Sequence, residues 1–305
     1  MSAGGDAPNP PSAPGAASAP GTAPGSAAEL AVEVALEAVQ VDGAAGVGVV
    51  RGGERADGLA GRRVLIGPVD PCGACDVCRR GGAAVCPLIR RRGPLGESPV
   101  ATAAARWLVP LGDGLDLPLP AAAAVAGDVA LAYTLYARTG VAPRDAVVVV
   151  GESPISRFLI EILVGKGIAP AALATGGAWA DWLGKRRIAA GADRAALQAA
   201  LDGRDPAQRD QGQRPWRVIC VDPRAVATAA ALAGPRATLT VFAGAGQMPA
   251  IPGDALGREL TVVGVAAPHP DLVVEAAAMC VRRDVDLVDG TSLAPDPLRT
   301  HVRVA

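Results

Sequence analysis

The sequence predicts an α/β protein, with a doubly wound parallel sheet and a second, smaller β-rich domain. From residue 119 onward, apolar runs of strand length alternate with stretches of helical periodicity. Before residue 119 the segments are short, alternating and rich in Val and Gly, as small strands and turns are. Half of the 305 residues are apolar, so the chain is long enough to bury two cores.

Composition excludes several classes of partner. The formal net charge is −1, the arginines are scattered and aromatic residues make up 3% of the chain, so we expect no nucleic acid and no anionic membrane as partners. Each apolar run ends well short of the ~18 residues that a membrane span needs. The N-terminus lacks a basic segment followed by an apolar one, so we expect a cytoplasmic protein. In the cytoplasm, clustered cysteines are more often metal ligands than disulfides.

The first part of the chain predicts a tail and then strands. Residues 1–28 consist almost only of Ala, Gly, Pro and Ser, a composition that predicts disorder. The pattern from Glu29 to Val64 predicts short strands joined by turns. A cysteine-rich loop follows, and "AARWLVPL", from Ala104 to Leu111, predicts a further strand. We place this domain at 29–118.

The second part predicts βαβ units. A helix through "AGDVALAYTLYARTG" ends on Gly140, and "DAVVVVG" is a continuous apolar run typical of a strand buried on both faces. A helix in "ISRFLIEILVGKG", the strand "AALAT" and a helix from about Trp179 to Gly191 come next. The runs "WRVICVD", "ATLTVFAG" and "ELTVVGV" repeat the strand pattern, and "DLVVEAAAMCVRR" predicts a last helix before a weak strand. Strands that alternate with helices form a parallel sheet, here placed at 119–266.

Four of the six cysteines follow the spacing C-x2-C-x2-C-x7-C: Cys72, Cys75, Cys78 and Cys86. Four thiolates can close a tetrahedral shell around zinc and leave no open position, so we predict one structural zinc ion per chain. An iron–sulfur cluster is an alternative, because C-x2-C-x2-C and a Cys before Pro87 are similar to the ferredoxin pattern, although its last spacer is three residues. A loop without metal is the other alternative. Cys220 and Cys280 lie in apolar surroundings and are expected to be core residues.

The turn after the first buried strand is a candidate nucleotide site. Gly151, Ser153 and Ser156 stand where a dinucleotide-binding turn has G-x-G-x-x-G, and Arg157 follows them. Only the first glycine of that motif is present, but serine is small and its hydroxyl can donate to a phosphate. We therefore predict that these four residues contact a pyrophosphate. The alternative is a βα turn that binds nothing.

The end of the next strand bears on the choice of cofactor. NAD-binding folds carry an acidic residue there, whereas this chain has Thr175 followed by two glycines. Lys185, Arg186 and Arg187 lie downstream and could pair with a 2′-phosphate. The sequence therefore favours NADP slightly over NAD, although these cations could also form a solvated helix face.

These features together resemble the medium-chain dehydrogenase/reductase superfamily, of the zinc-containing alcohol dehydrogenase type. The residues that carry the resemblance are "AGRRVLIGPVDPCGACDVCRRGGAAVC", "VALAYTLYARTGVAPRDAVVVVGESPIS" and "GRELTVVGV". The resemblance implies a Rossmann domain inserted in a GroES-like β-rich domain, so that residues 267–305 return to the first domain. It also implies a nucleotide cofactor, a small-molecule substrate and assembly as dimers or tetramers.

The chain departs from this family where its catalytic zinc is bound. No His and no Cys occurs before Cys72, and Gly127 or a neighbour stands where the last catalytic cysteine is expected. The β-rich domain is also shortened, and no residue can be named as catalytic. Two hypotheses follow: an NAD(P)-dependent oxidoreductase of a small alcohol or carbonyl without the usual catalytic zinc, or an inactive relative that acts as a scaffold or nucleotide-sensing module.

The remaining polar side chains offer no obvious acid for catalysis. His269 and His301 are expected at the surface, and the two phenols, Tyr133 and Tyr136, on a packed helix.

Overall fold

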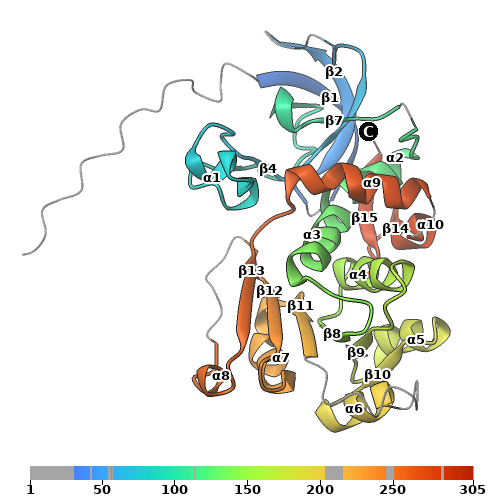
Figure 1. Cartoon of the computed structure of the whole chain (residues 1–305). Coiled ribbons are helices and arrows are strands. Elements are labelled where there is room, and N and C mark those ends of the chain that lie inside the picture. Colours follow the sequence, from blue (N-terminus) through green and yellow to red (C-terminus); the bar gives the residue numbers. More distant parts are fainter. Residues whose placement is uncertain are drawn as a thin grey trace, which may run out of the picture.

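The computed structural model describes residues 31–41, 43–53, 56, 58–112, 114–202, 216–244, 251–282 and 285–304. The predicted tail, 1–28, lies outside the described residues. Figure 1 shows a β-rich unit at the top, a parallel sheet below it, and helices α3 (Ala130–Thr139) and α4 (Pro154–Gly165) between the two. This arrangement confirms the predicted α/β fold class.

The β-rich unit is one seven-stranded sheet built from both ends of the chain. Its order is β14-β15-β1-β2-β3-β7, and β6 also pairs with β1. The strands are β1 (Ala31–Gln40), β2 (Gly46–Gly52), β3 (Arg63–Ile66), β6 (Val100–Ala104), β7 (Val109–Pro110), β14 (Thr291–Ser292) and β15 (Thr300–Val304). The C-terminal end of β1 pairs antiparallel with β15, and its N-terminal half pairs with β6. The last residues therefore complete the sheet that the first described residues begin.

The second sheet is parallel and has the order β10-β9-β8-β11-β12-β13. Its strands are β8 (Ala146–Val150), β9 (Ala171–Leu173), β10 (Ala189–Gly191), β11 (Trp216–Cys220), β12 (Thr238–Phe242) and β13 (Thr261–Val265). The chain moves outward from β8 in one direction and then restarts at β11 on its other side. This reversal is the topological switch point at which doubly wound sheets bind ligands.

The structure corrects two of the predicted elements. The helix expected to reach Gly191 ends as α5 (Gly177–Lys185), because Arg187 adopts a left-handed φ of 57°, and β10 follows. The strand expected from Ala104 to Leu111 is interrupted by a 3₁₀ turn, η3 (Ala105–Trp107), before β7.

The other helices cover the sheets. They are α6 (Arg194–Asp202), α7 (Val226–Leu232), α8 (Asp254–Gly257), α9 (Val273–Val281) and α10 (Leu287–Gly290), with 3₁₀ turns η6 (Pro223–Ala225) and η7 (Pro270–Leu272) before α7 and α9. Trp179 on α5 and Cys280 on α9 are both buried.

A single long helical segment joins the two units. It consists of α2 (Leu119–Ala124), a π-helical turn η4 (Val125–Val129) and α3. The segment is long and apolar enough to cross a membrane, but 78% of its apolar window is buried inside the protein, as in a core helix. Its residues pack in one cluster with Val47 of β2 and Val149 of β8, so the two sheets share a continuous core.

Candidate metal centre and nucleotide-binding turn

The four clustered cysteines converge in a small lobe at the side of the β-rich unit. The lobe runs between the strands of a two-stranded sheet, β4 (Val69–Asp70) and β5 (Arg90–Arg91), and contains α1 (Asp76–Arg79) and a 3₁₀ turn, η2 (Ala83–Val85). All four Sγ atoms lie within 4.8 Å of one another, which is the geometry of a tetrahedral thiolate site. Cys72 Sγ is 3.5 Å from Cys86 Sγ and 4.0 Å from Cys78 Sγ.

Backbone N–H groups surround these sulfur atoms. The amides of Cys75, Cys78 and Leu88 donate to Cys72 Sγ, Cys75 Sγ and Cys86 Sγ at 3.4, 3.5 and 3.3 Å. Although burial opposes ionisation of Cys72, hydrogen bonds from Ala74, Cys75 and Cys86 outweigh it and lower the pKa of this thiol to about 6. Burial raises the pKa of Cys78 to about 12. A divalent cation is what would allow all four thiols to ionise together, so this donor set fits zinc.

The lobe is anchored to both parts of the fold. Arg92 Nη2 pairs with Asp70 Oδ2 at 2.6 Å, and Trp107 Nε1 donates to the Pro71 carbonyl at 2.7 Å. On the other side, His269 Nε2 lies 2.9 Å from the carbonyl oxygen of Gly81. The expectation that His269 is a surface residue is therefore wrong, because its side chain is only 14% exposed and contacts the lobe.

The turn after β8 has the tight conformation that the glycine motif predicts. Gly151 has a φ of +117°, and a Cβ there would lie 3.0 Å from the backbone nitrogen of Asp222. Ser153 caps α4: its Oγ accepts a hydrogen bond from the Ser156 amide at 3.2 Å, and the two hydroxyls are 3.1 Å apart. Ser156 is fully buried, so Ser153 is the more accessible of the two.

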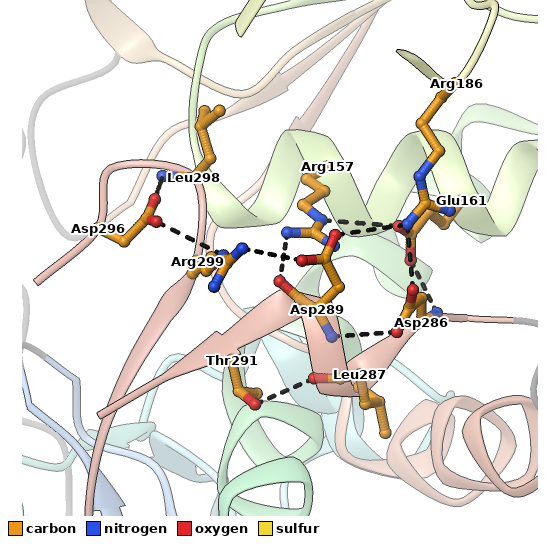
Figure 2. Close-up of polar contacts among 10 residues, drawn as sticks. All are labelled: Arg157, Glu161, Arg186, Asp286, Leu287, Asp289, Thr291, Asp296, Leu298 and Arg299. Atoms are coloured by element: carbon orange, nitrogen blue, oxygen red, sulfur yellow. Dashed lines mark hydrogen bonds and ion pairs between the residues drawn. The ribbon is translucent and has the colours of Figure 1, made fainter. Parts of the chain in front are cut away.

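The prediction that Arg157 contacts the pyrophosphate is wrong, because its side chain is bound elsewhere. Its side chain is 1% exposed, and its Nη atoms donate to the carbonyl and carboxylate of Asp289 at 2.5 and 2.8 Å. Figure 2 shows this guanidinium between Asp289 and Glu161, on the face of α4 that meets α10. The sequence did not reveal these contacts, because Asp289 lies 132 residues away.

Thr175 and an acidic residue border the same edge of the parallel sheet. β8 pairs in parallel with β9 and β11, so the segments after their carboxyl ends meet at this edge. Thr175 follows β9 and is exposed, and Asp222 follows β11. Arg224 donates to both oxygens of Asp222 at 3.0 Å and holds the pKa of that carboxyl below its usual value. Asp222 was not singled out from the sequence, although an acidic residue directly after an apolar strand is a usable signal.

The three cations that favoured NADP have different surroundings. Lys185 and Arg187 are exposed at the end of α5. Arg186 instead pairs with Asp286 at 3.1 Å and with Glu161 at 3.4 Å, so it belongs to the ion-pair cluster of Figure 2.

A glutamine side chain packs against Gly127, near which the resemblance implied the last catalytic cysteine. Gln40, at the end of β1, is 6% exposed, and its Oε1 would lie 2.3 Å from a Cβ placed on Gly127. Over the described ranges, no group of three or more His, Cys, Asp or Glu side chains converges besides the four lobe cysteines. A catalytic zinc ion therefore does not fit the residues present here.

Comparison with known proteins agrees with this architecture. The sequence matches no family model and no curated protein. An alcohol dehydrogenase of Escherichia coli CFT073, described as short-chain and crystallised with NADH, superposes with a TM-score of 0.72 at 16% identity, over 90% of this chain and 92% of that one. The chain has the fold of the medium-chain dehydrogenase/reductase superfamily.

Two other solved structures with this fold extend the comparison. Galactitol-1-phosphate dehydrogenase of Escherichia coli has a TM-score of 0.69 at 17% identity, over 90% of this chain and 88% of its own. A cobalt- and zinc-bound alcohol dehydrogenase of Pyrobaculum aerophilum has a TM-score of 0.68 at 15% identity, over 90% of each chain. The medium-chain dehydrogenase fold thus accounts for the inserted parallel sheet and for the return of the chain to the β-rich unit.

Proposed function

We propose that this protein is an NAD(P)-dependent oxidoreductase that transfers hydride between the nicotinamide and a small alcohol or carbonyl compound. The observation that carries the proposal is the turn at Gly151, which combines a positive φ, a helix N-terminus and the switch point of a doubly wound sheet. A bound nicotinamide cofactor supplies the hydride. Ser153, Thr175 and the backbone at Gly151 would hold it, and NADP is favoured because Thr175 replaces an acidic residue and Lys185 and Arg187 are exposed nearby in sequence.

The proposal includes one structural zinc ion, bound by Cys72, Cys75, Cys78 and Cys86, and no catalytic zinc. The converging thiols support the first part, and Gln40 packed against Gly127 supports the second. We also propose the cytoplasm as the compartment, a homodimer or tetramer as the assembly, and domains at 29–118, 119–266 and 267–305.

A panel of aliphatic and aromatic aldehydes and ketones, assayed with NADPH and with NADH, tests this function. Oxidation of the cofactor that depends on the carbonyl compound and on the protein supports the proposal. Binding of the cofactor without turnover of any compound supports the second candidate, a nucleotide-sensing scaffold, which the single remaining motif glycine favours.

A further inference from the structure

A carboxylate lies inside the turn at Gly151. Glu152 stands between Gly151 and Ser153 and is exposed. Because the two residues are neighbours in the chain, the Glu152 carboxylate stays within about 7 Å of the Ser153 backbone N–H in any rotamer. This distance is shorter than the Debye length of about 8 Å at physiological salt. An anion held at the N-terminus of α4 is therefore repelled by the charge of Glu152.

No cation among the described residues pairs with this carboxylate. Within those ranges Glu152 has neither an ion-pair partner nor a hydrogen-bond partner. Arg157 is bound to the C-terminal segment instead, and Arg224 donates to both carboxylate oxygens of Asp222 at 3.0 Å. Asp222 itself borders the turn, since a Cβ on Gly151 would lie 3.2 Å from the Asp222 Cβ. The charge of Glu152 is therefore left unpaired beside the predicted pyrophosphate site.

The N-terminus of α4 also offers fewer hydrogen-bond donors than a glycine-rich turn does. Pro154 is the first residue of the helix and has no N–H. The Ser156 N–H donates to Ser153 Oγ at 3.2 Å, and the Arg157 N–H donates to the Ser153 carbonyl at 3.1 Å. These groups are what an anion at a helix N-terminus normally contacts. The turn can therefore compensate little negative charge on a ligand.

Nucleotides differ in the charge that they bring to such a turn. The pyrophosphate of a dinucleotide is esterified at both ends, so each of its phosphates ionises once. ADP and ATP end in a phosphate monoester, whose second ionisation near neutral pH adds further negative charge. Coulomb repulsion grows in proportion to the charge of the ligand. A fixed carboxylate at the turn therefore weakens the binding of ADP and ATP more than the binding of a dinucleotide.

We propose that Glu152 is a specificity-determining residue that selects dinucleotides over nucleoside diphosphates and triphosphates. The assignment rests on the proposed function, and it names the ligand class of that turn: a nucleotide whose pyrophosphate is esterified at both ends. Glu152 lowers the affinity for each ligand that places phosphate at the turn, and it lowers the affinity for ADP more than that for ADP-ribose. Adenosine has no phosphate, so its affinity does not depend on Glu152.

The test is calorimetric titration of the full-length, zinc-loaded protein and of Glu152→Gln with adenosine, ADP-ribose and ADP in magnesium-free buffer. ADP-ribose and ADP share the adenosine and both phosphates, and they differ in the ester at the terminal phosphate. We expect Glu152→Gln to bind ADP-ribose about threefold and ADP about tenfold more tightly, with adenosine unchanged. High salt should reduce both gains. Glu97→Gln, which removes the same charge from an exposed residue before β6, is the matched control and should change none of these affinities.

The outcomes separate this assignment from the proposed function. If Glu152→Gln keeps the ratio of ADP affinity to ADP-ribose affinity of the unchanged protein, the assignment is overturned and the nucleotide site stands. An equal gain for adenosine, or the same gains in Glu97→Gln, also overturns it, because repulsion between Glu152 and a phosphate would not then be the cause. If neither protein binds ADP-ribose or NADPH at millimolar concentration, the turn is not a nucleotide site, and the proposed function fails together with this assignment.

Discussion

Some residues of this protein contact partners that are near in sequence, and others contact partners more than a hundred residues away. The four lobe cysteines lie within 15 residues of one another, and their spacing alone predicts that the sulfur atoms converge, as they do. Arg157 is the opposite case, because its partner Asp289 comes from the far end of the chain. Gln40 could not be predicted to fill the space beside Gly127, since that contact depends on how the two units pack. Sequence reasoning therefore succeeds where both partners lie in one segment.

The metal site gives the first prediction at this scale. Replacing Cys75 with Ser removes one of four soft ligands, so we expect the bound zinc to fall from about one per chain to near zero and the segment 70–90 to become sensitive to protease. Metal analysis of the purified proteins checks this, with Cys280→Ser on α9 as a control for loss of a thiol elsewhere. Unchanged zinc content in Cys75→Ser would show that these thiols do not form the site.

Asp128 gives a prediction about pH. Its folded pKa lies above the ordinary value of 3.8, so the folded protein holds this proton to a higher pH than the unfolded chain does. Unfolding then releases a proton, and the contribution of Asp128 to stability falls as pH rises from 3.8 through the raised value. We expect the free energy of unfolding of Asp128→Asn, measured relative to the unchanged protein, to increase over this window. A constant difference between the two proteins across the window would contradict the raised pKa.

The predicted secondary-structure elements agree with the structure where the apolar residues of the sequence show a strong pattern. The runs around Val148, Val218 and Thr240 form strands of the parallel sheet, and α3 ends before Gly140, which has a φ of 62°. β10 was missed because three residues of Ala and Gly carry no strand signal next to a helical pattern. The π-helical turn η4 was also not predicted; it lies against α4, α9 and strands β2 and β3 of the β-rich unit, contacts that depend on the tertiary fold. The element that carries Asp128 was thus visible as a helix but not as a bulge.

The N-terminus of α4 gives a prediction at the scale of the element. Ser153→Ala removes the side-chain cap on the Ser156 amide, and we expect a loss of about 1 kcal/mol in the free energy of unfolding. Ser153→Gly should lower the free energy of unfolding by only about a few tenths of a kcal/mol. This variant should also bind the nucleotide more tightly, because it restores a motif glycine. Denaturant unfolding and cofactor titration check both variants against Ser98→Ala, on an exposed loop. Equal affinity in Ser153→Gly and the unchanged protein would count against a pyrophosphate site at this turn.

Besides the continuous apolar core, a cluster of ion pairs connects the parallel-sheet unit to the C-terminal segment. Arg157 and Glu161 on α4, and Arg186 at the end of α5, meet Asp286 and Asp289 of the C-terminal segment (Figure 2). Gly290 packs so closely on Phe158 that a Cβ there would lie 2.4 Å from its ring. The family resemblance implied that the chain returns to the β-rich unit. No sequence pattern indicated that the returning segment forms ion pairs with α4, because the paired charges lie far apart in the sequence.

Replacing a buried residue of this ion-pair cluster should lower the free energy of unfolding more than replacing an exposed one. Among the described residues, Arg157→Leu leaves Glu161, which is 7% exposed, with Arg186 as its one ion-pair partner. We expect a loss of about 3 kcal/mol in the free energy of unfolding. Arg299→Leu removes a 40% exposed side chain from the rim of the same cluster and should cost less than about 1 kcal/mol. Similar losses in the two variants would show that burial does not set the strength of these contacts.

The most direct test of the central claim is a titration of the full-length protein with NADPH and NADH, followed by quenching of tryptophan fluorescence and by energy transfer to the nicotinamide. Trp179 and Trp182 stack on α5, 5.3 Å between ring centroids, directly after the strand that ends near Thr175, so they report on this edge of the sheet. We predict saturable binding at micromolar concentrations, tighter for NADPH than for NADH. No binding of either cofactor at millimolar concentration would contradict the account, because the turn at Gly151 would then be structural only.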